Sequence, residues 1–157
     1  MFGVSLPASG MIDAAYRVVG EEATMGMTLI GRAAALWFVI LLLAIANGVL
    51  RERVLIPRLG VSGGLVLSGV LLAAFIMTVA FIGVGWLGSR DARGLLLVGA
   101  AWLVATLLFE FGFGLARGKP LAEILAAYTF RDGNLWPLVL AVTALAPWLA
   151  GKLRGWL

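Results

Sequence analysis

The sequence has 157 residues, of which 62% are apolar and 13% charged, with 12 Lys and Arg, 8 Asp and Glu, and neither His nor Cys. That charged fraction is about half the ~25% of an ordinary soluble domain. Such a composition excludes a soluble globular protein, a disordered chain and a disulfide scaffold. It also excludes metal or haem binding through His or Cys, and nucleophilic catalysis by either. It indicates an integral membrane protein, and no cofactor is expected.

Residues 1–28 form a mixed segment before the first long apolar stretch. Apolar residues recur there at helical spacing, whereas Asp13, Tyr16 and Arg17 fall on another side. This pattern fits a short helix lying on the membrane surface. A frayed N-terminal tail or a start codon placed too early explains it equally well.

Residues 29–157 contain four apolar stretches separated by charged residues. Each stretch is close to the roughly 20 residues with which a helix crosses a hydrocarbon core of ~30 Å. We expect membrane spans near residues 29–50, 65–87, 94–115 and 135–153, with residues 51–58 as a loop. Gly60, Gly64 and Ser68 recur every four residues, which is typical of helix faces that approach closely in lipid.

A shorter amphipathic segment lies between the third and fourth spans. Pro120 suits a first helical position, and Leu121, Ile124 and Leu125 follow on one side. We expect a short interfacial helix over residues 121–128. The predicted fold is thus an all-α integral membrane bundle of about four up-and-down helices, with both termini on one side. The 12 Lys and Arg divide equally between the two sides, so they do not select an orientation.

Polar residues gather near one end of the first and third spans and form a candidate intramembrane cluster. Asn47, Arg51 and Glu52 end the first span, Glu110 is the only charge in the third, and Arg117 follows it. A lone carboxylate in the apolar zone costs about 2.5–3.5 kcal/mol on insertion scales, so it needs a partner, a proton or water. We expect Glu110 to pair with Arg51, with Asn47 beside them and Arg117 as the second choice. A structural pair that fixes helix register is the preferred interpretation, and a proton- or ligand-responsive carboxylate is the alternative.

Further residues are expected on the same membrane face as this cluster. Polar ones are Tyr128, Arg131 and Asn134, and aromatic ones are Phe109, Phe111, Phe113 and Trp136. The aromatic side chains are interpreted as core and lipid contacts rather than as a stacking platform.

Three short motifs resemble those of a family of small uncharacterised bacterial multi-pass inner-membrane proteins. They are Asn-Gly-x-x-Arg-Glu at 47–52, Glu-Phe-Gly-Phe-Gly at 110–114 and Gly-x-Leu-Trp-Pro-Leu at 133–138. The resemblance covers roughly residues 30–150. It implies a small multi-pass helical protein in the bacterial cytoplasmic membrane, and it implies no activity, cofactor or substrate.

The expected function is that of a non-catalytic accessory or structural subunit of a larger membrane assembly. The alternative is a small oligomeric transporter or channel subunit that uses Glu110. An enzyme that acts on lipid is the least supported class, because the chain has no His, no Cys and no acid-rich metal motif. The expected partners are membrane lipids together with a larger membrane protein or further copies of the chain. The net charge of +4, spread over short loops, fits anionic lipid head groups better than nucleic acid.

Overall fold

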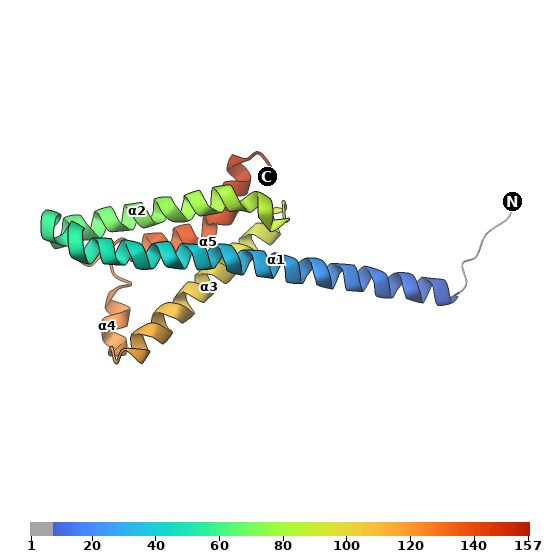
Figure 1. The fold of residues 1–157 in the computed structure, drawn as a ribbon, viewed down its shortest axis with the longest axis horizontal. Helices are drawn as coiled ribbons and strands as arrows, with labels where there is room; N and C mark the ends of the chain where they lie inside the picture. Colours follow the sequence, from blue (N-terminus) through green and yellow to red (C-terminus); the bar gives the residue numbers. More distant parts are fainter. Residues whose placement is uncertain (1–7) are drawn as a thin grey trace.

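The computed structural model describes residues 8–157, and over that range the protein is an all-α bundle (Figure 1). The long helices are α1 (Ala8–Leu50), α2 (Ile56–Leu87), α3 (Ala92–Ala116) and α5 (Trp136–Leu153). The shorter elements are a π-helical segment (Arg51–Leu55), α4 (Leu121–Ala126) and a 3-10 turn (Arg131–Gly133). The all-α bundle expected from the sequence is confirmed, as is a short helix before the last long one.

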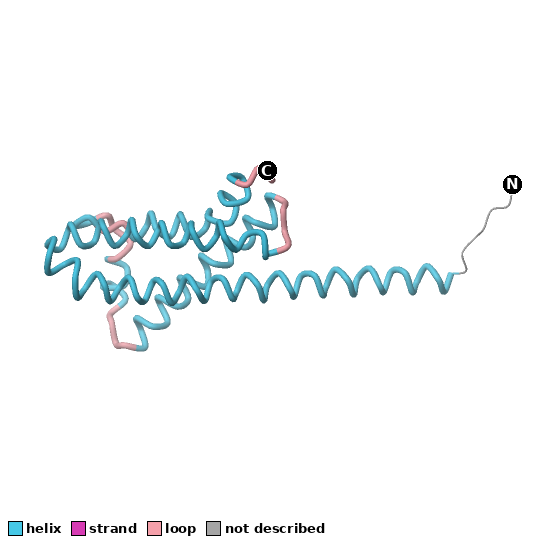
Figure 2. The backbone as a smooth tube through the Cα atoms, turned by 45° about the horizontal axis from the view of Figure 1, so that its top comes forward, coloured by secondary structure: helices cyan, strands magenta, loops and turns pink. Residues whose placement is uncertain are grey.

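The loop expected at residues 51–58 is wrong, because these residues are helical. The backbone passes from α1 through the π-helical segment into α2, and it reverses only at Gly60, where φ is 75° and ψ is 173°. Glycine reaches this conformation without the steric penalty that a Cβ would bring. Beyond the reversal, α2 runs antiparallel to α1 (Figures 1 and 2). The charges at 51–58 therefore do not mark the turn. It lies at Gly60, the first glycine that follows them.

The N-terminal segment is not a separate helix or a tail within the described residues. Residues 8–28 belong to α1, which extends well beyond the rest of the bundle (Figures 1 and 2). Residues 1–7 lie outside the described part of the chain. A helix of 43 residues is about 65 Å long, roughly twice the length that a bilayer core requires.

The bundle core is centred on α5, which packs against both α2 and α3. Trp102, Leu95 and Ile76 are among its most deeply buried side chains, and the indole Nε1 of Trp102 donates to the carbonyl oxygen of Ala33 on α1 at 2.9 Å. Small residues allow close contact, as the spacing of small residues in α2 predicts. A Cβ on Gly64, for example, would lie 2.9 Å from the backbone nitrogen of Ile56.

Three helical stretches are long and apolar enough to cross a membrane, namely Tyr16–Leu87, Ala92–Ala116 and Trp136–Leu153. The first includes the reversal at Gly60, so it consists of two antiparallel helices. Large apolar side chains cover the outside of the bundle, as expected where the surrounding solvent is lipid. These properties are those of a membrane protein.

Candidate functional site

A cavity lies between α1 and α3, where the C-terminal half of α3 diverges from the other long helices (Figure 1). Its volume is about 530 Å³, within the usual range of ligand pockets. Ile45 and Phe113 line it and are still 51% and 52% exposed, so the cavity opens sideways between the two helices. Its deeper walls are apolar, with side chains such as Leu41, Leu72 and Val139.

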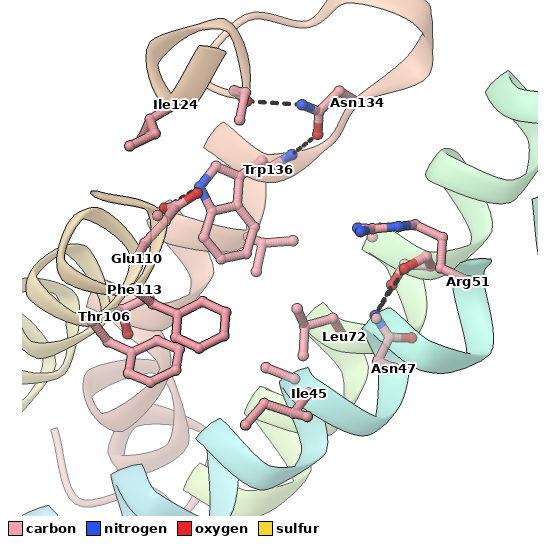
Figure 3. Close-up of a pocket in the computed structure, with 18 of the residues that line it drawn as sticks. Ile45, Asn47, Arg51, Leu72, Thr106, Glu110, Phe113, Ile124, Asn134 and Trp136 are labelled. Atoms are coloured by element: carbon pink, nitrogen blue, oxygen red, sulfur yellow. Dashed lines mark hydrogen bonds between the residues drawn. The ribbon is translucent and has the colours of Figure 1, made fainter. Parts of the chain in front are cut away.

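Glu110, on α3, lines one wall of this cavity next to Trp136 (Figure 3), and two neutral donors bind its carboxylate. The hydroxyl of Tyr128 donates to its Oε2 at 2.6 Å, and the indole Nε1 of Trp136 donates to the same oxygen at 2.9 Å. Hydrogen bonds to a charged acceptor are about twice as strong as neutral ones. Burial raises the pKa of the Tyr128 hydroxyl above its usual range, and its bond to Glu110 raises this pKa further. Tyr128 therefore stays protonated and remains a donor.

The connection between α4 and α5 places these two donors. The side-chain amide of Asn134 donates to the carbonyl of Ala127 at 2.8 Å, and its Oδ1 accepts from the backbone N–H of Trp136 at 2.9 Å. Gly133 takes a φ of 82° in the turn before it, and a Cβ there would lie 3.1 Å from the carbonyl oxygen of Ser62. This turn is thus packed against α2 and orients the indole of Trp136 toward α3.

Asn47 lies on the opposite wall and is buried against α2. Its Nδ2 donates to the hydroxyl of Ser68 at 2.8 Å and to the carbonyl of the same residue at 3.1 Å. Its Oδ1 is buried without a hydrogen-bond partner among the described residues. The expected contact of Asn47 with Arg51 and Glu110 is therefore wrong. Ser68, one of the small residues of α2, lies close enough to accept the hydrogen bonds of Asn47 instead.

The expected pair of Glu110 and Arg51 is also wrong. The guanidinium of Arg51 binds the carboxylate of its neighbour Glu52 at 3.0 Å, at the edge of the cavity. The guanidinium of Arg117 lies 5.3 Å from the ring centroid of Phe113. All five residues of the predicted cluster nevertheless line the same cavity, so the prediction has the right location and the wrong contacts.

Sequence reasoning overlooked the part that aromatic donors play. Trp136 was interpreted as a core or lipid contact, yet its N–H binds Glu110. Tyr128 is expected from the sequence on the same membrane face as Glu110, but the sequence does not pair the two residues. The usable signal is that Tyr and Trp carry a polar group that needs a partner when buried. Both follow α3 on the same face as its single carboxylate.

Basic and aromatic residues also gather at the other end of the bundle. Arg32 donates to the carbonyl of Trp86 at 2.9 Å, and Arg154 donates to the carbonyl of Phe81 at 2.6 Å. The guanidinium of Arg154 lies 5.6 Å from the ring centroid of Trp156. Such mixtures of Trp, Tyr and basic residues are enriched where helices meet the membrane–water boundary.

The chain matches no protein-family model, no curated protein and no solved structure. The resemblance to small bacterial membrane proteins therefore remains an expectation from three motifs. The fold adds one observation to it, because residues of all three motifs line the cavity between α1 and α3. They are Asn47, Arg51, Glu110, Phe113, Asn134 and Trp136. In the described part of the chain, no group of three or more His, Cys, Asp or Glu side chains is placed to hold a metal ion.

Proposed function

We propose that the protein is a multi-pass protein of the bacterial cytoplasmic membrane, with four spans and both termini on one side. The antiparallel order of the long helices supports this arrangement, as do the basic and aromatic residues at both ends of the bundle. Reporter fusions at Ser89 and at the C-terminus should agree with each other and oppose a fusion at Arg58. Agreement among all three would contradict the four-span topology.

We infer further that the protein is a non-catalytic accessory or structural subunit, and one observation carries this proposal. Leu36 and Leu29 lie on one row of α1 and pack against the core of the bundle. The same row continues along the projecting part of α1 with Met25 and Val18, which are 69% and 55% exposed. An isolated helix is marginal in water, and most helical stability comes from packing of an apolar face. The projecting part of α1 is thus suited to bind a larger membrane protein.

Co-purification after mild detergent extraction tests this role. Val18→Glu and Met25→Glu should each abolish a stoichiometric complex with a larger partner. Thr24→Glu and Thr28→Glu introduce the same charge elsewhere on the helix and serve as matched controls. Loss of the complex in all four variants, or the absence of a larger partner from the wild-type preparation, would contradict the proposal.

One observation favours a second function, that of a small oligomeric transporter or channel subunit. Glu110 lines an open cavity, and its bonds come from neutral donors. Intramembrane acids that face a cavity often mark ion or proton pathways. Toward the other end, however, Trp102, Leu95 and Val84 fill the bundle. Proton or cation flux into liposomes that is lost in Glu110→Gln, together with a self-oligomer, would favour transport over the accessory role.

A further inference from the structure

The two ends of the cavity between α1 and α3 differ in chemistry. Toward the middle of the bundle its walls are aliphatic and aromatic, with Leu41, Leu72 and Phe109 among them. Toward the end at which α4 lies, its lining is charged. An opening of this kind, facing sideways between two apolar helices, fits an amphiphile with one apolar part and one charged part. In a bilayer the amphiphile at hand is a phospholipid.

The charged end contains both signs, and two of its pairs are already satisfied. The carboxylate of Glu52 binds Arg51 at 3.0 Å, and the carboxylate of Glu123 binds Lys119 at 2.7 Å. These four groups need no further counter-ion.

Two charges at the same end have no ionic partner among the described residues. Glu110 accepts from a phenol and an indole only, and Arg117 contacts an aromatic ring. They lie seven residues apart on or next to α3, hence about two turns or ~10 Å along the axis. The guanidinium of Arg117 bends back over Phe113, one turn closer to Glu110. One cation and one anion without an ionic partner therefore line the same end of the cavity.

We propose that the cavity binds one phospholipid whose head group carries a phosphate and a primary ammonium, as in phosphatidylethanolamine. The phosphate lies at Arg117 and the ammonium at Glu110, while an acyl chain lies along the apolar walls. An ammonium has three N–H donors for the carboxylate, which a trimethylated head group lacks. An anionic head group without an ammonium leaves Glu110 without a cationic partner and adds a second negative charge beside it. The proposal depends on the membrane location and not on the accessory role.

Native mass spectrometry of the full chain, released from nanodiscs of defined composition, tests this site. Equimolar dioleoyl phosphatidylethanolamine, phosphatidylglycerol and phosphatidylcholine are offered together. We expect the wild type to retain one phospholipid, with phosphatidylethanolamine preferred by about tenfold, the scale of one hydrogen-bonded ionic contact. Glu110→Gln should remove the preference, and Arg117→Gln should lower retention of all three lipids.

Matched variants separate the site from general lipid adhesion. Glu21→Gln and Arg93→Gln change the same residue types far from the cavity and should bind lipid as the wild type does. Ile45→Trp fills the opening from a half-exposed position that tolerates a larger side chain, and it should abolish retention. Gel filtration and thermal unfolding verify that each variant is folded.

Three results of the lipid-retention experiment would overturn the proposal. These are equal retention of the three lipids by the wild type, an unchanged preference in Glu110→Gln, and lipid retention that survives Ile45→Trp. Photocrosslinking from position 45 to a protein instead of a lipid would show that a partner helix occupies the cavity, and this also overturns it. Failure here leaves the accessory proposal standing, because that proposal is tested on Val18 and Met25.

Discussion

The close contact of α3 with α5 at Gly99 leaves no room for a side chain, and Gly99→Ala should disrupt it. A Cβ at Gly99 would overlap the carbonyl oxygen of Ala144 and lie 2.8 Å from the carbonyl carbon. Both atoms belong to the backbone of α5, so no side-chain rotation can relieve the overlap. The two helices must move apart instead.

The required movement sets the size of the effect. Ordinary contacts of a Cβ begin at 3.4 Å, so α5 must shift by well over half an ångström. A gap of 0.5–1 Å already loses a quarter to a half of each dispersion contact across an interface. Overpacking of a close-packed core costs about 1–3 kcal/mol. The better helix propensity of Ala returns at most ~1 kcal/mol. Because the overlap is with backbone atoms, the cost lies in the upper part of this range, about 2–3 kcal/mol. After the gain in helix propensity, we expect Gly99→Ala to lower the free energy of unfolding by about 1–2 kcal/mol.

Gly112→Ala is the matched control on the same helix, because a Cβ at Gly112 meets nothing within 4 Å. Reversible unfolding in mild detergent, followed by circular dichroism, gives both values. Gly112→Ala should be as stable as the wild type or gain up to about 1 kcal/mol from helix propensity. If Gly99→Ala proves as stable as Gly112→Ala, α3 and α5 do not approach as closely as described, and the reasoning fails.

Three further predictions test other contacts in the fold. Glu110→Gln and Tyr128→Phe should show a coupling of roughly 1.5–3 kcal/mol in a double-mutant cycle on unfolding. Glu110→Gln and Arg51→Leu should instead have additive effects. Coupling of Glu110 with Arg51 and not with Tyr128 would support the ion pair expected from the sequence. Asp91 caps α3 by accepting a hydrogen bond from the backbone N–H of Gly94. This bond, and a second one donated by the hydroxyl of Ser89, lower the pKa of Asp91 below 3.8. The stability it supplies is therefore complete above pH 3.8 and is lost as the pH falls through its lowered pKa, so Asp91→Asn should flatten the acid unfolding curve in that window. Trp102→Phe removes the buried N–H that donates to the carbonyl of Ala33 on α1. It should lower the free energy of unfolding by about 1–3 kcal/mol in the same assay. An unchanged value would mean that this hydrogen bond contributes nothing to stability.

Apolar runs and the charges between them are sufficient to predict the long helices, since helix length and lipid exposure follow directly from hydropathy. The exact end of each helix depends on local backbone chemistry. Residues 51–58 are charged and still helical, whereas the reversal falls at Gly60. Likewise, residues 8–28 continue into the rest of α1 without a break, because they contain no proline and their apolar residues keep helical spacing.

The location of the candidate site follows from the sequence, but its contacts do not. A four-helix order brings the ends of the first and third spans to one face, and Asn47, Arg51 and Glu110 do line one cavity. Which groups meet depends on how far the helices diverge. The C-terminal half of α3 diverges from the other long helices (Figure 1), and the connection through α4 to the start of α5 brings Tyr128 and Trp136 to Glu110. Spacing along one helix carries no information about that angle.

The uninterrupted length of α1 has a mechanical consequence. The helix is anchored to the bundle at Ala33 and Ile40, where it is buried. On one side of this fulcrum lies the projecting segment, and on the other lies Asn47 with the wall of the cavity. Because α1 is one continuous helix, with about 25 residues before Ala33 and about ten after Ile40, a sideways load on the longer, projecting end tilts the shorter, opposite end. Such a tilt changes the width of the gap toward α3. If a partner binds the projecting segment and a lipid fills the cavity, as proposed, each binding event affects the other by the same free energy.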